Sequence, residues 1–314
     1  MDASRTALLF PGQGSQFIGM GQEFLDSDSD ARQLMEMAEE RSGFLLQELS
    51  IDGPMDELTR TAHLQPAMTV MNIICWQALK KAGVDAAYFA GHSLGEYSAL
   101  VASGVLMPEE AITLVTERGR LMCRESKANP GAMSAILKLE LADVEDVVSS
   151  SSDKGIVVVA NHNSAQQVVI SGEEAAVSAA AALAEERGGR AVSLPVSAAM
   201  HSPLMAGAVE DFSRFLEKIP FNEPSGTILF NVTAKREIDP AVIKDIMSRQ
   251  IASMVKWYDI ITRMRENGVT QFIEVGPKKV LTGLMKKILP KDSGCSCFQV
   301  DSPQTLSHCL EALR

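Results

Sequence analysis

Short apolar runs that end in turns containing proline or glycine alternate with longer segments whose apolar residues recur at helical spacing. The run 6–10 ends at Pro11, and the run 86–90 ends at Gly91. Pro108 opens one of the helical segments, since proline is favoured in the first turn of a helix. Short buried strands that alternate with helices predict a mostly parallel sheet with helices on both of its faces.

The pattern changes at the Asn-Pro-Gly sequence of residues 129–131. The chain then predicts a strand, a helix, two strands, a helix and a strand, at 132–139, 142–149, 156–160, 167–171, 173–186 and 190–196. This βαββαβ order is that of a ferredoxin-like unit. We therefore predict a small ferredoxin-like subdomain at 129–197, inserted into a large α/β subdomain that comprises 1–128 and 198–314.

The chain after the insertion continues the large subdomain. It predicts strands at 227–232, 271–275 and 295–300 and helices at 241–252, 258–267 and 279–289. Strands and helices thus alternate in both parts of this subdomain, as one mostly parallel sheet requires.

Composition narrows the possible partners and the compartment. The formal net charge is −11 and the isoelectric point is near 5.0. Such a field repels nucleic acid and anionic membranes, so neither is expected as a partner. The longest apolar stretch, 67–79, is shorter than a bilayer-spanning helix, and the N-terminus is too interrupted for a signal peptide. We therefore expect a cytoplasmic protein.

The cysteines indicate neither a disulfide framework nor a metal site. Their number, five, is odd, whereas a framework of disulfides pairs them. Cys295 and Cys297 are close in sequence, but no residue nearby completes the four ligands of a tetrahedral zinc site. Alternate positions on a late strand explain this pair, and no metal is expected.

Residues 91–95 read Gly-His-Ser-Leu-Gly and match the G-x-S-x-G pattern of a nucleophile elbow. The motif lies between a predicted strand and a predicted helix, where it exposes the Ser93 hydroxyl at a helix N-terminus. Ser93 is therefore the candidate nucleophile, and the large subdomain is predicted to have an α/β-hydrolase-like core. The other interpretation is a plain glycine-rich turn with Ser93 as a helix cap.

A serine nucleophile needs a base, and His201 is the best placed of the five histidines. It follows the inserted subdomain, where the chain re-enters the large one. His92 adjoins Ser93, but neighbours on a sharp turn diverge, and His308 lies in the predicted terminal helix. A structural role for His201 stays open at this point.

The glycine-rich loop at 12–16 follows the first strand directly. It is a weak nucleotide fingerprint, because Phe17 stands where G-x-G-x-x-G requires glycine. Backbone amides between glycines are free to point into a cleft. The amides of Gln13 and of Leu94, the residue after the nucleophile, are therefore the candidate oxyanion hole.

Arg118 is predicted to lie on the buried face of its helix. Its neighbours three and four positions away are apolar, namely Leu114, Val115, Leu121 and Met122. A buried arginine needs a counter-charge. Two partners are open: Glu96, in a structural role, or a substrate carboxylate held by two parallel N–H bonds.

Together these motifs resemble the malonyl-CoA:acyl-carrier-protein transacylase family, and the likeness covers essentially the whole chain. The matching positions are 10–16, 91–100, 117–120, 131–133, 160–164, 194–197, His201, Asn231, Gln250 and 274–277. This combination is far more specific than G-x-S-x-G alone.

The resemblance implies a role for each candidate residue. Ser93 is the nucleophile, His201 the general base, and Arg118 the clamp on the malonyl carboxylate, with the oxyanion hole at the two amides named above. The backbone carbonyl of Gln250 orients the histidine, so no triad aspartate is expected. Asn161 and Asn163 match family positions near the mouth of the site. Met200, before the histidine, departs from the small or aromatic residues that the family usually has there.

The resemblance also implies the reaction. A malonyl group passes from malonyl-CoA to Ser93 and then to the phosphopantetheine thiol of acyl carrier protein, with ping-pong kinetics and no metal or redox cofactor. The expected pathway is fatty acid synthesis, and a trans-acting acyltransferase of a polyketide synthase is the alternative. A serine acyl hydrolase and a non-catalytic module that binds carrier protein are the rival interpretations. Carrier proteins are acidic, so two basic clusters are candidates for docking: the lysines at 278–291, and Arg187 with Arg190 on the small subdomain.

Overall fold

The computed structural model describes residues 2–196 and 198–313. Ser197, the last residue of the predicted small subdomain, lies outside the described residues, as do Met1 and Arg314. The predicted boundaries near 128 and 198 fall in the segments that join two separate sheets, and the division into two domains stays a prediction.

The larger sheet has five parallel strands in the order β7-β2-β1-β8-β9. Its strands are β1 (Thr6–Phe10), β2 (Tyr88–Gly91), β7 (Thr227–Ile228), β8 (Gln271–Val275) and β9 (Ser296–Val300). The central strand β1 and its neighbour β2 both end in the glycine-containing turns that the sequence predicts there. The carboxyl ends of parallel strands meet at one edge of the sheet, so these two turns lie side by side.

Helices cover both faces of the larger sheet. The helices of the described chain that pack in this part are α1 (Gln22–Ser27), α2 (Ser29–Ser42), α3 (Leu46–Ile51), α4 (Met55–Thr59), α5 (Thr61–Lys81), α6 (Gly95–Ala102), α7 (Pro108–Ala128), α10 (Ala206–Leu216), α11 (Pro240–Arg249), α12 (Trp257–Glu266), α13 (Val280–Ile288) and α14 (Pro303–Ala312), with short 3-10 turns η1 (Ala3–Arg5), η3 (Pro203–Met205) and η4 (Gln250–Ala252). On β1, Leu8 and Phe10 face the core beneath α5, α6 and α7, whereas Ala7 and Leu9 face α12 and α13. This alternation is the period of two that a strand imposes.

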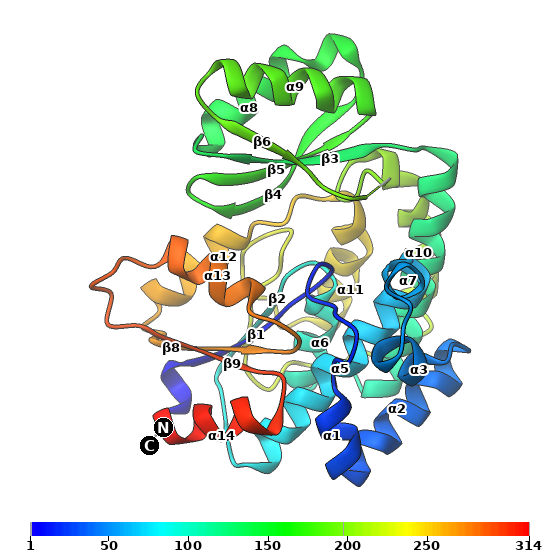
Figure 1. Ribbon diagram of the computed structural model, residues 1–314, viewed down its shortest axis with the longest axis vertical. Coiled ribbons are helices and arrows are strands. Elements are labelled where there is room, and N and C mark those ends of the chain that lie inside the picture. Colours follow the sequence, from blue (N-terminus) through cyan, green and yellow to red (C-terminus); the bar gives the residue numbers. More distant parts are fainter. Residues whose placement is uncertain (1, 197, 314) are drawn as a thin grey trace.

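The smaller sheet has four antiparallel strands in the order β4-β5-β3-β6. Its elements are β3 (Ala132–Leu137), α8 (Leu141–Ser150), η2 (Ser152–Lys154), β4 (Val157–Ser164), β5 (Gln167–Gly172), α9 (Glu174–Glu186) and β6 (Arg190–Ser193). Figure 1 shows α8 and α9 on the outer face of this sheet, while its other face turns toward the large sheet. The predicted α/β fold with an inserted ferredoxin-like unit is confirmed.

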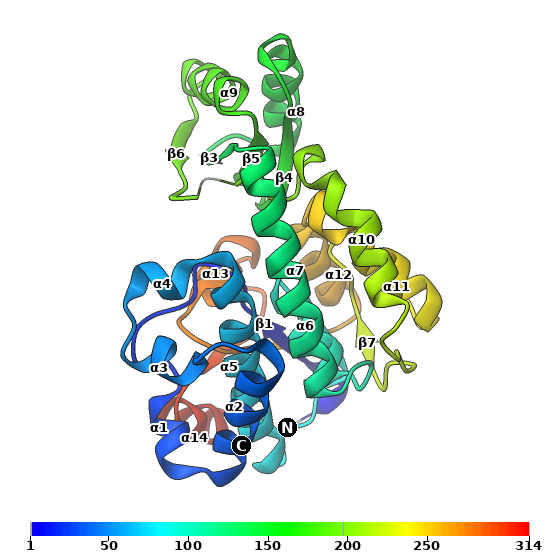
Figure 2. The same cartoon turned by 90° about the vertical axis from the view of Figure 1, so that its right-hand side faces the viewer.

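The long helix α7 connects the two sheets. In Figure 2 it runs from the layer of the large sheet up to the small one, and β3 begins shortly after its end. Both termini lie together at the end of the molecule opposite the small sheet (Figures 1 and 2). No helix of the described residues is long and apolar enough to cross a membrane.

Two predicted strands are shorter in the structure. The strand expected at 227–232 ends at Ile228, because Phe230 donates its N–H to Lys235 in a turn and Asn231 donates its own to the Glu96 side chain. The strand expected at 190–196 ends at Ser193, and Pro195 beyond it has no N–H for a ladder. The turn that ends the strand at Ile228 places Asn231 beside the candidate nucleophile.

Candidate functional site

Ser93 stands at a sharp turn between β2 and α6. Its φ of 52° is in the left-handed region, which costs a residue other than glycine about 1–3 kcal/mol. The flanking glycines allow the turn: a Cβ on Gly95 would lie 2.0 Å from the Phe10 carbonyl oxygen, and one on Gly91 would lie 1.9 Å from the Gly95 carbonyl carbon. The predicted strand, turn and helix around the serine are therefore confirmed.

Asn231 fixes this turn with its side chain. Its Oδ1 accepts the Ser93 N–H at 2.7 Å, and its Nδ2 donates to the Gly91 carbonyl at 2.7 Å. These two bonds hold the strained backbone on either side of His92. Sequence analysis assigned Asn231 no role beyond a family match, because Asn231 follows β7 in a turn without a periodic pattern.

His201 contacts the Ser93 hydroxyl directly. The Ser93 Oγ lies 2.7 Å from His201 Nε2, within the range needed for proton transfer. His201 Nδ1 lies 3.0 Å from the carbonyl oxygens of both Gln250 and Ser253. Two acceptors place the imidazole proton on Nδ1, so the Nε2 lone pair faces the serine. The Ser253 carbonyl is a second orienting group that the sequence did not reveal.

Burial keeps the His201 imidazole neutral. The side chain is 4% exposed, and burial, then the positive charge of Arg118, lowers its pKa to about 3. The histidine is therefore unprotonated and able to accept a proton at any pH in the physiological range.

The two backbone amides proposed for the oxyanion hole have no acceptor among the residues that the structure describes. The Ser93 amide is bonded to Asn231 and is not available to a ligand. Within the ranges 2–196 and 198–313, the backbone amides of Gln13 and Leu94 have no protein acceptor. They are the donors beside the nucleophile that remain for a developing oxyanion, and that role stays a prediction.

Arg118 is buried and points at the nucleophile. It is 1% exposed, and its Nη2 lies 3.3 Å from Ser93 Oγ and 3.0 Å from Gln250 Oε1. Its Nη1 donates to Gln65 Oε1. No ion pair joins Arg118 to Glu96 among the described residues, because the amide of Gln250 lies between the two charges. A guanidinium held by neutral carbonyls beside a nucleophile suits a substrate anion.

The predicted residues at the mouth of the site have different surroundings. Asn163 Oδ1 lies 2.8 Å from His92 Nε2, so His92 pairs with the small sheet. Asn161 is buried and lies in a backbone bridge to Val255. Met200 is half-buried and packs against apolar residues of both sheets, directly before His201.

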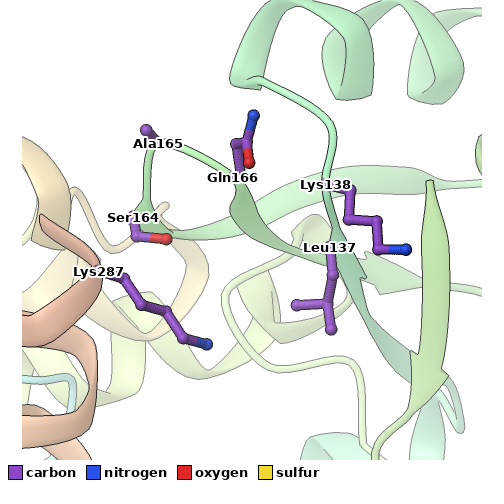
Figure 3. A pocket seen from close by; sticks show the side chains of 6 residues that line it. All are labelled: Leu137, Lys138, Ser164, Ala165, Gln166 and Lys287. Carbon is purple, nitrogen blue, oxygen red and sulfur yellow. The ribbon is translucent and has the colours of Figure 1, made fainter. Parts of the chain in front are cut away.

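A hollow of about 300 Å³ opens between the small sheet and α13. Figure 3 shows its lining: Leu137, Lys138, Ser164, Ala165, Gln166 and Lys287. Ser164 follows Asn163, which contacts His92 beside the nucleophile. Docking of an acidic partner at lysines 278–291 stays a prediction. No group of three metal-ligating side chains occurs in the part of the chain that the structure describes.

Comparisons with known proteins agree along the whole chain. Residues 7–300 match the model of the acyl transferase domain family. A malonyl CoA-acyl carrier protein transacylase of Bacillus subtilis is 38% identical over 99% of this chain and 98% of its own. The crystal structure of a malonyl-CoA:acyl carrier protein transacylase of Xanthomonas oryzae is 37% identical with a TM-score of 0.94, covering 99% of each chain.

A third similar structure contains a partner. It is a malonyl-transacylase in complex with a type II polyketide acyl-carrier protein, 35% identical with a TM-score of 0.94, covering 98% of this chain and 99% of that one. The similarity of all three extends over both sheets.

Proposed function

Because this chain belongs to the malonyl-CoA:acyl-carrier-protein transacylase family of acyltransferases, we propose that it moves a malonyl group from malonyl-CoA to the phosphopantetheine thiol of an acyl carrier protein. One observation carries the proposal: the Ser93 hydroxyl lies 2.7 Å from His201 Nε2 and 3.3 Å from Arg118 Nη2. The hydroxyl of the proposed nucleophile therefore contacts both the proposed base and the cation proposed to bind the malonyl carboxylate.

The first half-reaction loads the enzyme. Ser93 Oγ attacks the thioester carbonyl while its proton passes to His201 Nε2, and the carbonyl oxygen becomes an oxyanion held by the amides of Gln13 and Leu94. The C–S bond then breaks, and the coenzyme A sulfur leaves with the proton from His201. The products are a malonyl ester on Ser93 and free coenzyme A.

The second half-reaction repeats these steps with another thiol. His201 takes the proton of the phosphopantetheine thiol, whose sulfur attacks the ester on Ser93. The C–O bond breaks, and Ser93 recovers its proton from His201. Neither half-reaction changes an oxidation state, so a redox cofactor has no role, and Ser93 and His201 supply the nucleophile and the base without a metal. We therefore propose that neither takes part, and full activity after dialysis against a chelator is the expected check.

A serine hydrolase is the weaker proposal. Such an enzyme gains nothing from a buried arginine beside the nucleophile, and it usually orients its histidine with a carboxylate. Here the carbonyls of Gln250 and Ser253 occupy that position. The acidic residues of the inserted segment, such as Asp143 and Asp146, lie on or near the outer helix α8.

Intact-mass analysis tests the proposed function. Brief exposure to malonyl-CoA is expected to add the mass of one malonyl group to the protein. Addition of holo acyl carrier protein is expected to remove that mass and to transfer it to the carrier. Apo carrier protein, which lacks the phosphopantetheine thiol, is the control and leaves the acyl-enzyme intact. Release of free malonate in place of transfer would identify a hydrolase.

Met200 is proposed to select against a branched acyl group. It lies between the two sheets next to His201, and methionine fills irregular gaps. One methyl group rejected sterically is worth roughly 10–200-fold. We expect malonyl-CoA to load in preference to methylmalonyl-CoA, and Met200→Ala to narrow that preference. A competition assay read by acyl-enzyme mass checks this, with the exposed Met107→Ala as control. Equal loading of both thioesters by the wild type would exclude this selective role of Met200.

A further inference from the structure

Glu96 is a buried carboxylate three residues after the nucleophile. It has no exposed surface, and each of its oxygens accepts one hydrogen bond. The Asn231 N–H donates to Oε1 at 2.6 Å, and Gln250 Nε2 donates to Oε2 at 2.6 Å. Both partners also contact the turn at Ser93, because Asn231 and Gln250 bond its N–H and its carbonyl, respectively. Glu96 thus lies behind the site and does not contact the Ser93 hydroxyl.

The side-chain amide of Gln250 lies between Glu96 and Arg118 with one end toward each. Its Nε2 donates to Glu96 and, at 2.8 Å, to the Ser93 carbonyl, while its Oε1 accepts from Arg118 Nη2 at 3.0 Å. An amide can be turned over with little change in shape. An ionised carboxylate only accepts hydrogen bonds, so Glu96, together with the Ser93 carbonyl, favours the orientation in which the NH₂ end of the amide faces them.

We propose that Glu96 is a positioning residue that fixes the orientation of the Gln250 amide, and that this orientation aims Arg118 at the carboxylate of the acyl group. The proposal rests on the proposed malonyl transfer and adds a residue that determines its specificity. The same Gln250 supplies a backbone carbonyl to His201 Nδ1. One residue therefore positions both the base and the clamp.

The arrangement leaves the guanidinium available to substrate. A carboxylate in direct contact would satisfy Arg118 and compete with the acyl group for the same N–H groups. Glu96 compensates the buried charge from behind the amide, and Arg118 Nε keeps no partner among the described residues. The buried charge of Arg118 is therefore stabilised although no carboxylate contacts it directly. Without such compensation, a buried arginine charge would be costly.

Glu96→Gln tests the proposal with an isosteric change. The new side chain keeps an oxygen for Asn231 and presents an NH₂ group to Gln250 Nε2. The Gln250 amide then loses its acceptor at position 96, or it turns and loses its bond to the Ser93 carbonyl. Either change disturbs its contact with Arg118. We expect kcat/KM for malonyl-CoA to fall about ten- to a hundredfold, while loading with acetyl-CoA changes little. The malonyl-to-acetyl ratio is the measurement.

Glu96→Asp distinguishes this role from simple packing. Aspartate leaves a cavity but remains acceptor-only, so it is expected to retain more of the malonyl-to-acetyl ratio than Glu96→Gln, even if both rates fall. If Glu96 acted only by packing, Glu96→Gln would instead retain more of the malonyl-to-acetyl ratio than Glu96→Asp. Glu274→Gln is the matched control, since Glu274 is also buried and accepts two backbone N–H bonds, from Leu281 and Thr282, away from Arg118. Its ratio is expected to equal that of wild type.

A second measurement uses the wild-type protein. Burial raises the pKa of Glu96 to about 7, and a protonated carboxyl would disturb the Gln250 amide as glutamine at position 96 does. Two other ionisable groups face Glu96: Arg118, and Tyr97, whose pKa burial raises. Neither titrates near pH 7, and the pKa of His201 is far below it. The wild-type malonyl-to-acetyl ratio is therefore expected to fall as pH decreases through about 7, and the Glu96→Gln ratio to stay constant.

The outcomes separate this proposal from the proposed function. If the wild type forms no malonyl-enzyme, the proposed function fails and the positioning role of Glu96 fails with it. If the wild type is malonylated but Glu96→Gln retains its malonyl-to-acetyl ratio, only the role of Glu96 is overturned. A ratio that does not change with pH in either protein overturns it as well.

Discussion

Replacement of Ser93 by alanine is expected to abolish both the acyl-enzyme and the transfer of malonyl groups. The only oxygen within hydrogen-bond distance of both His201 Nε2 and Arg118 Nη2 among the described residues is the Ser93 hydroxyl, and the double displacement has no second nucleophile there. Loss of a member of such a unit removes most of the rate. Transfer to holo carrier protein, followed with radiolabelled malonyl-CoA, is the measurement.

Peptide mapping gives this prediction its control. In wild-type protein the malonyl group is expected on the peptide that contains Ser93. Cys123 is the half-exposed cysteine of α7, the helix that carries Arg118, so Cys123→Ser is expected to acylate as wild type does. A malonyl label on a cysteine would contradict the serine mechanism.

Arg118→Ala is expected to lose malonyl transfer and to keep, or gain, transfer of acetyl groups. A hydrogen bond to a charged group is worth about 1.5–3 kcal/mol, so loss of two parallel bonds lowers kcat/KM for malonyl-CoA at least about tenfold. An acetyl group has no carboxylate, so its transfer does not depend on these two hydrogen bonds. Initial rates with both thioesters measure the change in selectivity.

Arg120→Ala is the matched control for Arg118. It removes an arginine from the same helix, but Arg120 is exposed and pairs with Glu117. Its malonyl and acetyl rates are expected to equal those of wild type. Undiminished malonyl transfer by Arg118→Ala would return Arg118 to a structural role.

Most of the fold and the centre of the site could be predicted from local sequence patterns. The order of strands and helices follows from apolar spacing and turn residues, which depend on neighbours in sequence. The position of Ser93 follows from the flanking glycines, and the burial of Arg118 from the apolar residues one helical turn away. Each of these inferences needs only a few consecutive residues.

The support around that centre was not predictable in the same way. Asn231 reaches the site from the turn after β7, and Gln250 and Ser253 reach it from the short 3-10 turn η4 and its end, after α11. They lie more than a hundred residues from Ser93 in the chain, and amide and carbonyl groups are common everywhere. Only the tertiary fold shows which of them turn inward, and it also explains why the strand expected at 227–232 ends early.

The charge of Arg118 has a consequence for the strength of the base. Burial, and then the positive charge of Arg118, lowers the pKa of His201 to about 3, whereas efficient proton transfer favours a pKa near the working pH. If Arg118 binds the malonyl carboxylate as proposed, the bound carboxylate offsets the Arg118 charge and raises the pKa of the imidazole. On this proposal the substrate strengthens the base that acts on it. An acyl group without a carboxylate leaves the Arg118 charge in place, so we expect its transfer to be slower, and selection to act on rate as well as on affinity.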